Sequence, residues 1–313
     1  MDAAQLRPLS IGEVLDLAIK IYRQRFVHLV KAVAVVVAPV AVVSALVQVS
    51  TFPDFAAFST TPETVPEFGI ADFWAFLAGI LVVALLGFLS SQIATAASFM
   101  IVSGAYLDQR PDWRASLAYA WSRLRSLAWL AVVTGVLLML AFLALVIPGV
   151  YLYGAWVVAV PVLLLEDLRG TKALRRSHEL VKGRWWPTAV AVVVSVILAA
   201  MVQSVFGGVL SGVIIAGGGS VAVAAAQAVA TTAGSVLTTP FTAAVITVVY
   251  FDLRVRKEGF DLELLARRVG VEPPPGGFPA PSPPPGPPTV DEPPPFWPPP
   301  PGWGGSGRAT GGP

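Results

Sequence analysis

The sequence predicts an all-α integral membrane protein, in which six transmembrane helices form three repeats of an interfacial helix plus a helical hairpin, followed by a disordered Pro-rich C-terminal tail. Composition is the first reason, because 55% of the 313 residues are hydrophobic and only 13% are charged, against roughly a quarter in soluble domains. The second reason is that aliphatic residues form nearly uncharged blocks of the roughly 20 residues that cross a bilayer. The third is that basic residues gather between alternate blocks. This balance excludes a water-soluble enzyme.

Residues 1–26 form the first predicted element, a cytoplasmic amphipathic helix. Ser10 is a natural N-cap and Glu13 follows three residues later, which is the capping-box pattern that begins a helix. Val14 and Leu17 then lie on one apolar face of that helix, with charged residues elsewhere. Acidic residues stand among the bases and no small-residue cleavage site follows a short apolar core, so we expect no signal peptide.

The predicted membrane domain extends over residues 27–268 and holds six apolar segments. We expect the spans at residues 27–50, 73–103, 127–147, 150–165, 187–215 and 221–251. Pro148 and Gly149 separate the third span from the fourth, and they predict a tight hairpin because proline ends a helix and glycine permits a reversal. The glycines at 217–219 predict a similar turn between the fifth span and the sixth.

The basic residues indicate the orientation of these spans. They lie before or at the start of the first span, between the second and third, between the fourth and fifth, and after the sixth. Lys and Arg in short flanking loops stay on the cytoplasmic side. We therefore expect a multi-pass protein of a bacterial cell membrane with both termini in the cytoplasm.

Three segments at the basic side share one pattern, at 10–31, 110–130 and 169–188. Each is a short amphipathic stretch that ends in a basic residue and leads into a span, and Trp121 belongs to the apolar face of the second. Alignment of the segments places three arginines at the equivalent point: Arg25, Arg125 and Arg184. Lipid phosphates lie where an interfacial helix enters the bilayer, so these arginines are candidate lipid-headgroup or partner contacts. Ordinary topology determination is the alternative.

Each even-numbered span leaves the membrane on the motif Asp-x-Arg. The pairs are Asp108 with Arg110, Asp167 with Arg169, and Asp252 with Arg254. Residues two apart on a helix do not face each other, so any pairing must reach another segment. The six residues are therefore candidate clamps between repeats, and a docking site is the alternative.

Residues 269–313 form the predicted cytoplasmic tail. This segment is rich in proline and glycine and cannot bury a core. Phe296 and Trp297 interrupt a proline run, which resembles a proline-rich ligand for a partner protein. A tail that only aids solubility is the alternative.

No catalytic, cofactor or metal site is predicted. The chain has no cysteine, and its two histidines, His28 and His178, lack the partner spacing of a zinc site. Nothing in the spans suggests a nucleic-acid partner or the buried charges that mark an ion pathway. Several polar residues of the spans either line a polar groove or form hydrogen bonds between helices: Gln48, Gln92, Gln203, Gln227, Ser90, Ser91, Thr95, Ser98, Thr231, Thr232, Thr238 and Thr239.

Four motifs carry a family resemblance, and they are Leu6-Arg7-Pro8-Leu9-Ser10-Ile11-Gly12-Glu13, Leu163-Leu164-Leu165-Glu166-Asp167, Ala173-Leu174-Arg175-Arg176-Ser177 and Lys182-Gly183-Arg184-Trp185-Trp186. With them, residues 6–268 resemble the membrane domain of bacterial glycerophosphoryl diester phosphodiesterases and similar stand-alone actinobacterial membrane proteins. In those enzymes a separate soluble barrel with His and acidic metal ligands performs the reaction, and no stretch of this chain supplies one. The resemblance implies membrane embedding and a glycerophospholipid context without catalysis.

Two classes of function remain. The first is a non-catalytic scaffold or accessory module that interacts with membrane lipids, anionic ones included, or with partner proteins. The alternative is a small transporter or lipid-translocating protein. The lack of buried charge favours the scaffold, whereas a water-filled polar groove favours the transporter.

Overall fold

The computed structural model describes residues 9–51, 70–107, 109, 112–217, 219–260 and 262–263. Within these residues it leaves out the side chains of Gln48, Thr51, Ala71, Asp72 and Ser220. The predicted tail and the candidate clamp residues Asp108 and Arg110 lie outside the described residues.

All regular secondary structure in the described ranges is helical. The helices are α1 (Ile11–Gln24), α2 (Phe26–Thr51), α3 (Ile70–Tyr106), α4 (Trp113–Ser122), α5 (Leu124–Ala144), α6 (Val146–Ala155), α7 (Ala159–Leu165), α8 (Thr171–Val181), α9 (Trp185–Ile215) and α10 (Ser220–Glu258). Six segments are long and apolar enough to cross a membrane: Phe26–Val47, Phe73–Tyr106, Leu124–Ala144, Val146–Leu165, Trp185–Ile215 and Val221–Glu258. The predicted helical class and the six apolar spans are therefore confirmed.

The N-terminal helix begins as its sequence predicts. Both bonds of the capping box are present, since the Ser10 backbone N–H donates to Glu13 Oε2 (2.7 Å) and the Glu13 N–H donates to Ser10 Oγ (3.4 Å). Val14 and Leu17 are buried on one face of α1 together with Ala18. That face packs against α10 and places α1 across the end of the bundle.

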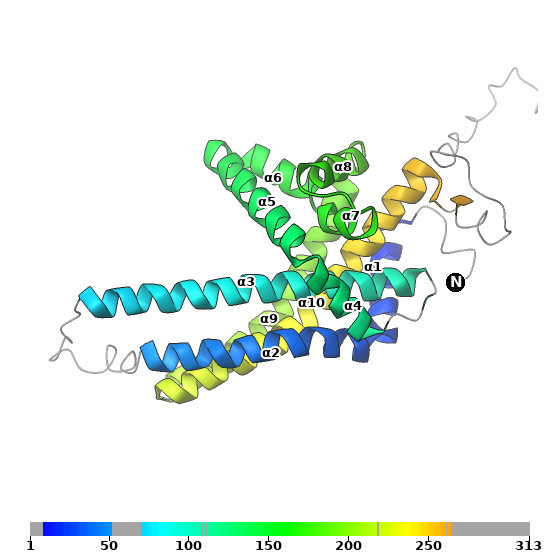
Figure 1. The fold of residues 1–313 in the computed structure, drawn as a ribbon. Coiled ribbons are helices and arrows are strands. Elements are labelled where there is room, and N and C mark those ends of the chain that lie inside the picture. Colours follow the sequence, from blue (N-terminus) through cyan, green and yellow to red (C-terminus); the bar gives the residue numbers. More distant parts are fainter. Residues whose placement is uncertain are drawn as a thin grey trace, which may run out of the picture.

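The long helices α2, α3, α9 and α10 lie side by side, and α5 with α6 forms a hairpin that diverges from α3 (Figure 1). The short helices α1, α4, α7 and α8 gather at one end of the bundle, which we call the basic end because most of the basic residues lie there. The main core is also at this end, where the buried rings of Tyr106 and Phe251 stack with centroids 4.2 Å apart. Away from it the apolar side chains of the spans are largely exposed, as expected for lipid-facing helices.

The hairpin of α5 and α6 turns earlier than predicted. The chain reverses at Leu145, which is extended (φ −162°, ψ 143°), and Pro148 and Gly149 lie in the first turn of α6. Proline is well placed there because the first-turn N–H groups need no helical partner. Gly149 has its own role, since a Cβ at this position would lie 2.5 Å from the Phe142 ring of α5. The glycine therefore permits close packing of the two helices rather than the turn itself.

Trp121, on the predicted apolar face of the second interfacial helix, does not pack into the protein core. This side chain is 67% exposed, whereas Ser116 and Ala120 form the buried face of α4. Small residues allow α4 to lie close to α3, and the indole is directed outward instead. Exposed tryptophans are typical of the boundary between lipid and water.

Candidate functional site

Three arginines occupy the breaks between a short helix and the long helix that follows it. Arg25 closes α1 (φ −110°, ψ 13°), Arg123 separates α4 from α5 (φ −98°, ψ 1°), and Arg184 precedes α9 (φ −130°, ψ 24°). The predicted equivalence thus holds for Arg25 and Arg184, but the structure places Arg125 inside the first turn of α5.

The displacement of two residues has a simple cause. A single residue links α4 to α5, whereas residues 182–184 link α8 to α9. In the sequence, Arg125 follows Asp108 at the same separation as Arg184 follows Asp167, and this equal spacing pairs the two arginines. Because the link between α4 and α5 is two residues shorter, this spacing leads to Arg125, two residues after the break at Arg123.

Two of the three break arginines reach the end of the returning span that follows them. Arg25 Nη2 donates to the backbone oxygen of Gln109 (3.2 Å). Arg123 Nη1 donates to Asp167 Oδ1 (2.5 Å), and its guanidinium lies 5.5 Å from the centroid of the Tyr119 ring. Tyr119 and Asp167 together raise the pKa of Arg123, so it stays charged. For Arg184, the described part of the chain offers no side-chain hydrogen bond or ion pair.

The loop between α7 and α8 presents Asp167 to this arginine. Asp167 has a left-handed backbone (φ 53°), which aspartate tolerates better than most residues, and Gly170 has φ 59° and ψ −134°, a region that only glycine adopts readily. Arg169 Nε lies 3.8 Å from the same Asp167 oxygen. The predicted clamp at Asp167 and Arg169 therefore reaches the junction of α4 and α5, within the same predicted repeat.

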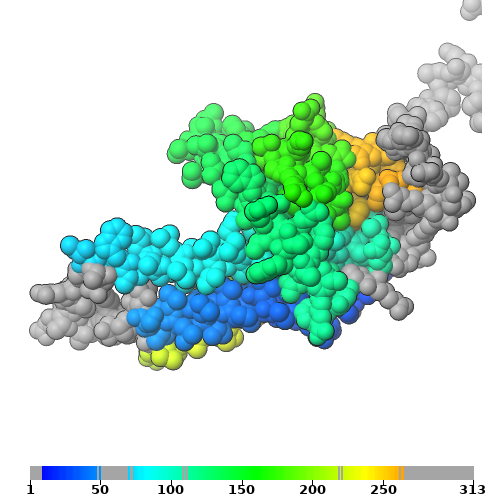
Figure 2. All heavy atoms as spheres, in the orientation of Figure 1, coloured from blue at the N-terminus to red at the C-terminus, as the bar shows by residue number. Residues whose placement is uncertain are grey.

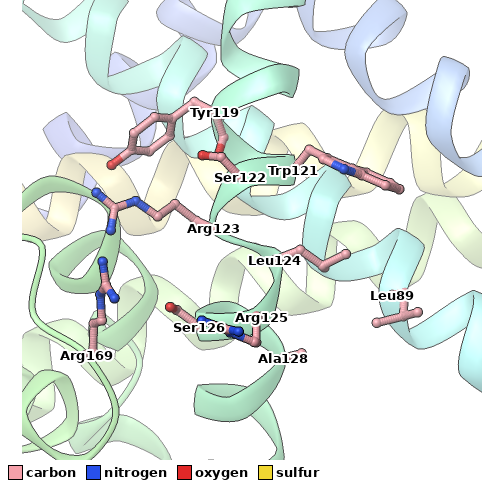
Figure 3. Close-up of a pocket in the computed structure, with 10 residues that line it drawn as sticks. All are labelled: Leu89, Tyr119, Trp121, Ser122, Arg123, Leu124, Arg125, Ser126, Ala128 and Arg169. Atoms are coloured by element: carbon pink, nitrogen blue, oxygen red, sulfur yellow. The ribbon is translucent and has the colours of Figure 1, made fainter.

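These residues border a cavity of about 850 Å³, which we call the arginine cleft. Figure 3 shows the guanidiniums of Arg123 and Arg169 on the same side as the Tyr119 hydroxyl, with Trp121 and Leu89 on the opposite side. The cleft lies at the base of the hollow that Figure 2 shows between α3 (cyan) and the hairpin of α5 and α6 (green). Its walls are Leu89, Tyr119, Trp121, Ser122, Arg123, Leu124, Arg125, Ser126, Ala128 and Arg169.

The arginine cleft carries an excess of positive charge. Arg123 is paired with Asp167, whose contact with Arg169 is long. Arg125 forms no hydrogen bond or ion pair with any residue that the structure describes. Two guanidiniums therefore share one carboxylate and a third is unpaired among the described residues, an arrangement that suits an anion with several oxygen atoms.

Asp252 joins two parts of the chain that lie far apart in sequence. The Leu9 N–H donates to Asp252 Oδ1 (2.8 Å), and Arg256 Nε donates to Asp252 Oδ2 (2.8 Å). Arg256 Nη2 also donates to the Leu9 oxygen (2.7 Å). The pair thus holds Leu9, close before the start of α1, on the end of α10. Arg254, by contrast, pairs with Glu258 (2.9 Å) one turn later on its own helix.

A second ionic cluster was not predicted, and it joins α7, α8 and α10. Arg176 Nε donates to Glu166 Oε2 (2.8 Å), its Nη2 donates to Glu258, and the Tyr250 hydroxyl donates to Glu166 Oε1 (2.9 Å). Burial lowers the pKa of Arg176, but the hydrogen bonds to the two glutamates outweigh this effect and raise it. Glu166 directly precedes Asp167 and ends an apolar run, which is the signal in the sequence that marks it.

The family comparison bears on the same region. The model of a family described as a domain of unknown function (DUF8558) matches residues 115–271, which include α5 through α10, most of α4 and every arginine of the cleft. No curated protein and no solved structure matches the chain. The family match covers half of the sequence. The protein therefore belongs to the family of the domain of unknown function DUF8558.

Proposed function

We propose that this protein is a non-catalytic membrane module that binds the phosphate headgroup of an anionic lipid in the arginine cleft. The observation that carries the proposal is the charge of this cavity: Arg169 shares Asp167 with Arg123, and Arg125 has no acidic partner among the described residues. A guanidinium binds phosphate oxygens in pairs. Each basic residue near the headgroups contributes about 1 kcal/mol to binding of anionic lipid.

The surroundings of the cleft favour a lipid over a free phosphate ion. Trp121 is 67% exposed beside the cleft, and Trp186 is 74% exposed near the break before α9. Exposed indoles in these positions support a headgroup-level location for the basic end. Above the cleft, exposed apolar side chains on α3 and α5, among them Leu85 and Val132, offer contacts for acyl chains.

The proposal includes a three-fold repeat with both termini in the cytoplasm. The element order supports it, because α1, α4 and α8 each precede a long helix after a short break that contains an arginine. The returning segments are α3, then α6 with α7, then α10. Reporter fusions after Glu63 and after Gly218 should report an outside location, and a cytoplasmic signal at either would contradict the orientation.

The lipid proposal is tested by charge removal inside and outside the cleft. Arg125→Gln with Arg169→Gln removes two guanidiniums, or about 2 kcal/mol, and should weaken retention of phosphatidylglycerol about 30-fold. The matched control is Arg23→Gln with Arg175→Gln, which removes the same charge from exposed positions on α1 and α8. Native mass spectrometry of the purified full chain, with phosphatidylcholine as the neutral lipid, gives the bound fraction.

Three results would contradict the proposal. Equal loss in the two double variants would show that the basic residues act only through total charge. Displacement of the lipid by millimolar inorganic phosphate would favour a soluble anion. Hydrolysis of a glycerophosphodiester by the protein in liposomes would show that the module is catalytic.

A further inference from the structure

A second cavity lies between α2, α3 and α10, in the apolar part of the bundle. It has a volume of about 600 Å³, within the usual range of small-molecule pockets. Its walls extend along α10 from Ala224 to Thr239, which is about 22 Å at the helical rise of 1.5 Å per residue. The cavity is therefore long and narrow, and we call it the hydroxyl trough after the side chains that line it.

The polar residues of the trough follow helical spacing. On α10, Gln227, Thr231, Ser235 and Thr239 recur every fourth residue and share one face. The facing helices contribute Ser44 from α2 and Ser90 and Ser91 from α3. Three helices thus direct polar groups into one cavity inside a region that is otherwise apolar.

Most of these hydroxyl groups have already donated their hydrogen. Ser44 donates to the Val40 oxygen (2.8 Å), Ser90 to the Gly87 oxygen (3.0 Å) and Thr231 to the Gln227 oxygen (2.8 Å), each on its own helix. Ser91 does the same with Phe88 (2.7 Å). Their oxygen atoms remain as acceptors, so the trough favours a ligand that donates hydrogen bonds.

Three further polar side chains of the trough lack a partner in the part of the chain that the structure describes. Within the described ranges Gln227, Ser235 and Thr239 form no side-chain hydrogen bond, although all three border the trough and are half-buried. An unpaired polar group in an apolar environment is unfavourable by roughly 2 kcal/mol or more. A ligand that pairs with them removes this penalty.

The charge of the walls restricts the ligand class. None of the described residues that line the trough is acidic or basic. An ionised headgroup would lose its hydration here without gaining a counter-charge. The ligand must therefore be neutral, in contrast to the ligand of the arginine cleft.

We propose that the hydroxyl trough binds a neutral lipid with a free hydroxyl group, of the monoacylglycerol type. The single chain lies along α10, and the hydroxyl groups donate to the serine and threonine oxygens while Gln227, Ser235 and Thr239 pair with the glycerol. This site is independent of the arginine cleft, which is formed by other residues at the basic end.

The test uses a monoacylglycerol with a diazirine in its acyl chain, and the full chain reconstituted in phosphatidylcholine vesicles. Gly87→Leu with Ala228→Leu fills the trough; a Cβ at Gly87 would meet no atom within 4 Å, so the space exists. The matched control is Gly135→Leu with Ala225→Leu, at exposed positions outside the trough, and a Cβ at Gly135 also meets no atom within 4 Å. Photolabelling of α10 peptides should fall at least tenfold in the first variant and stay unchanged in the second.

A polar variant tests the chemistry of recognition. Ser235→Ala with Thr239→Val keeps the shape nearly constant and removes two hydroxyl groups, so labelling should fall about tenfold. Equal labelling in the filled variant and its control would overturn the site. A diazirine fatty acid, which is charged, would overturn the neutral ligand class if it labelled α10 as strongly as the monoacylglycerol. Unchanged labelling of Ser235→Ala with Thr239→Val would overturn recognition of an alcohol. Arg125→Gln with Arg169→Gln should leave labelling unchanged, which separates this proposal from that of the cleft.

Discussion

Removal of the Asp252 carboxylate should release the N-terminal segment from the end of α10. Asp252 is 9% exposed and accepts two hydrogen bonds, from the Leu9 N–H and from the Arg256 guanidinium. Hydrogen bonds that involve a charged group contribute about 1.5–3 kcal/mol each. Arg256 is partly exposed and keeps its bond to the Leu9 oxygen in Asp252→Ala. The lower end of the range therefore applies, and α1 should lose about 3 kcal/mol of docking free energy.

The natural absence of cysteine makes this loss measurable. Val14 is buried on the docked face of α1 at 4% exposure, so a maleimide should react with Val14→Cys only when α1 opens. A loss of about 3 kcal/mol corresponds to a rise of about 100-fold in the labelling rate. Asp252→Asn retains an acceptor for the Leu9 N–H and should give an intermediate rate. Asp16→Ala, at an exposed position of α1, should leave the rate unchanged.

A rate in Asp252→Ala within threefold of the parent would refute this reasoning. It would show that the apolar face of α1 holds the helix without the clamp. A 100-fold rise in Asp16→Ala as well would show that any loss of acidic charge from the basic end opens the helix.

Three further changes should produce measurable effects. Gly154→Ala places a Cβ 2.6 Å from the Trp185 indole nitrogen. Overpacking of this kind should destabilise the detergent-solubilised protein by about 1–3 kcal/mol in thermal unfolding. An unchanged melting temperature would show that the indole moves freely. Glu166→Ala leaves Arg176 with one carboxylate partner and should lower the free energy of unfolding by about 3 kcal/mol in the same assay. An unchanged melting temperature would mean that the ionic cluster of Arg176, Glu166 and Glu258 does not contribute to the stability of the fold. Burial raises the pKa of Tyr22 above its ordinary value of 10.0, so the folded state holds the phenol proton more tightly than the unfolded state. The contribution of Tyr22 to the free energy of unfolding is complete below pH 10 and falls as the pH rises further. Tyr22→Phe should therefore flatten the decline in stability above pH 10.

The sequence contains most of the information about the spans and the first interfacial helix. Uncharged apolar length marks each span without reference to its neighbours, and the Ser10–Glu13 box depends only on residues three apart. The position of Leu145 at the hairpin turn was missed because no local breaker marks it. In this hairpin Gly149 gives space to Phe142, and only tertiary packing distinguishes that role from a turn.

The arginine cleft could be predicted in part. The clustering of basic residues follows from charge patterning, and Arg125 does line the cavity. Which arginines meet depends on the left-handed turn at Asp167, which brings Arg169 to the junction of α4 and α5. The Arg176–Glu166 pair likewise depends on the approach of α7 to α8. Contacts between separate helices were invisible to spacing rules within one helix.

The central position of α10 has a consequence for biosynthesis. This helix contacts α1, α2, α3, α7, α8 and α9, and it is the most buried of the six spans. It is also the last span to leave the ribosome, so α2 and α3 enter the membrane before their common partner has been made. Leu9, which is synthesised before all six spans, contacts Asp252 and Arg256 only when α10 is complete. Helical segments can therefore insert one by one, but the packed core and the contact between the two ends of the domain form only after synthesis has passed residue 258.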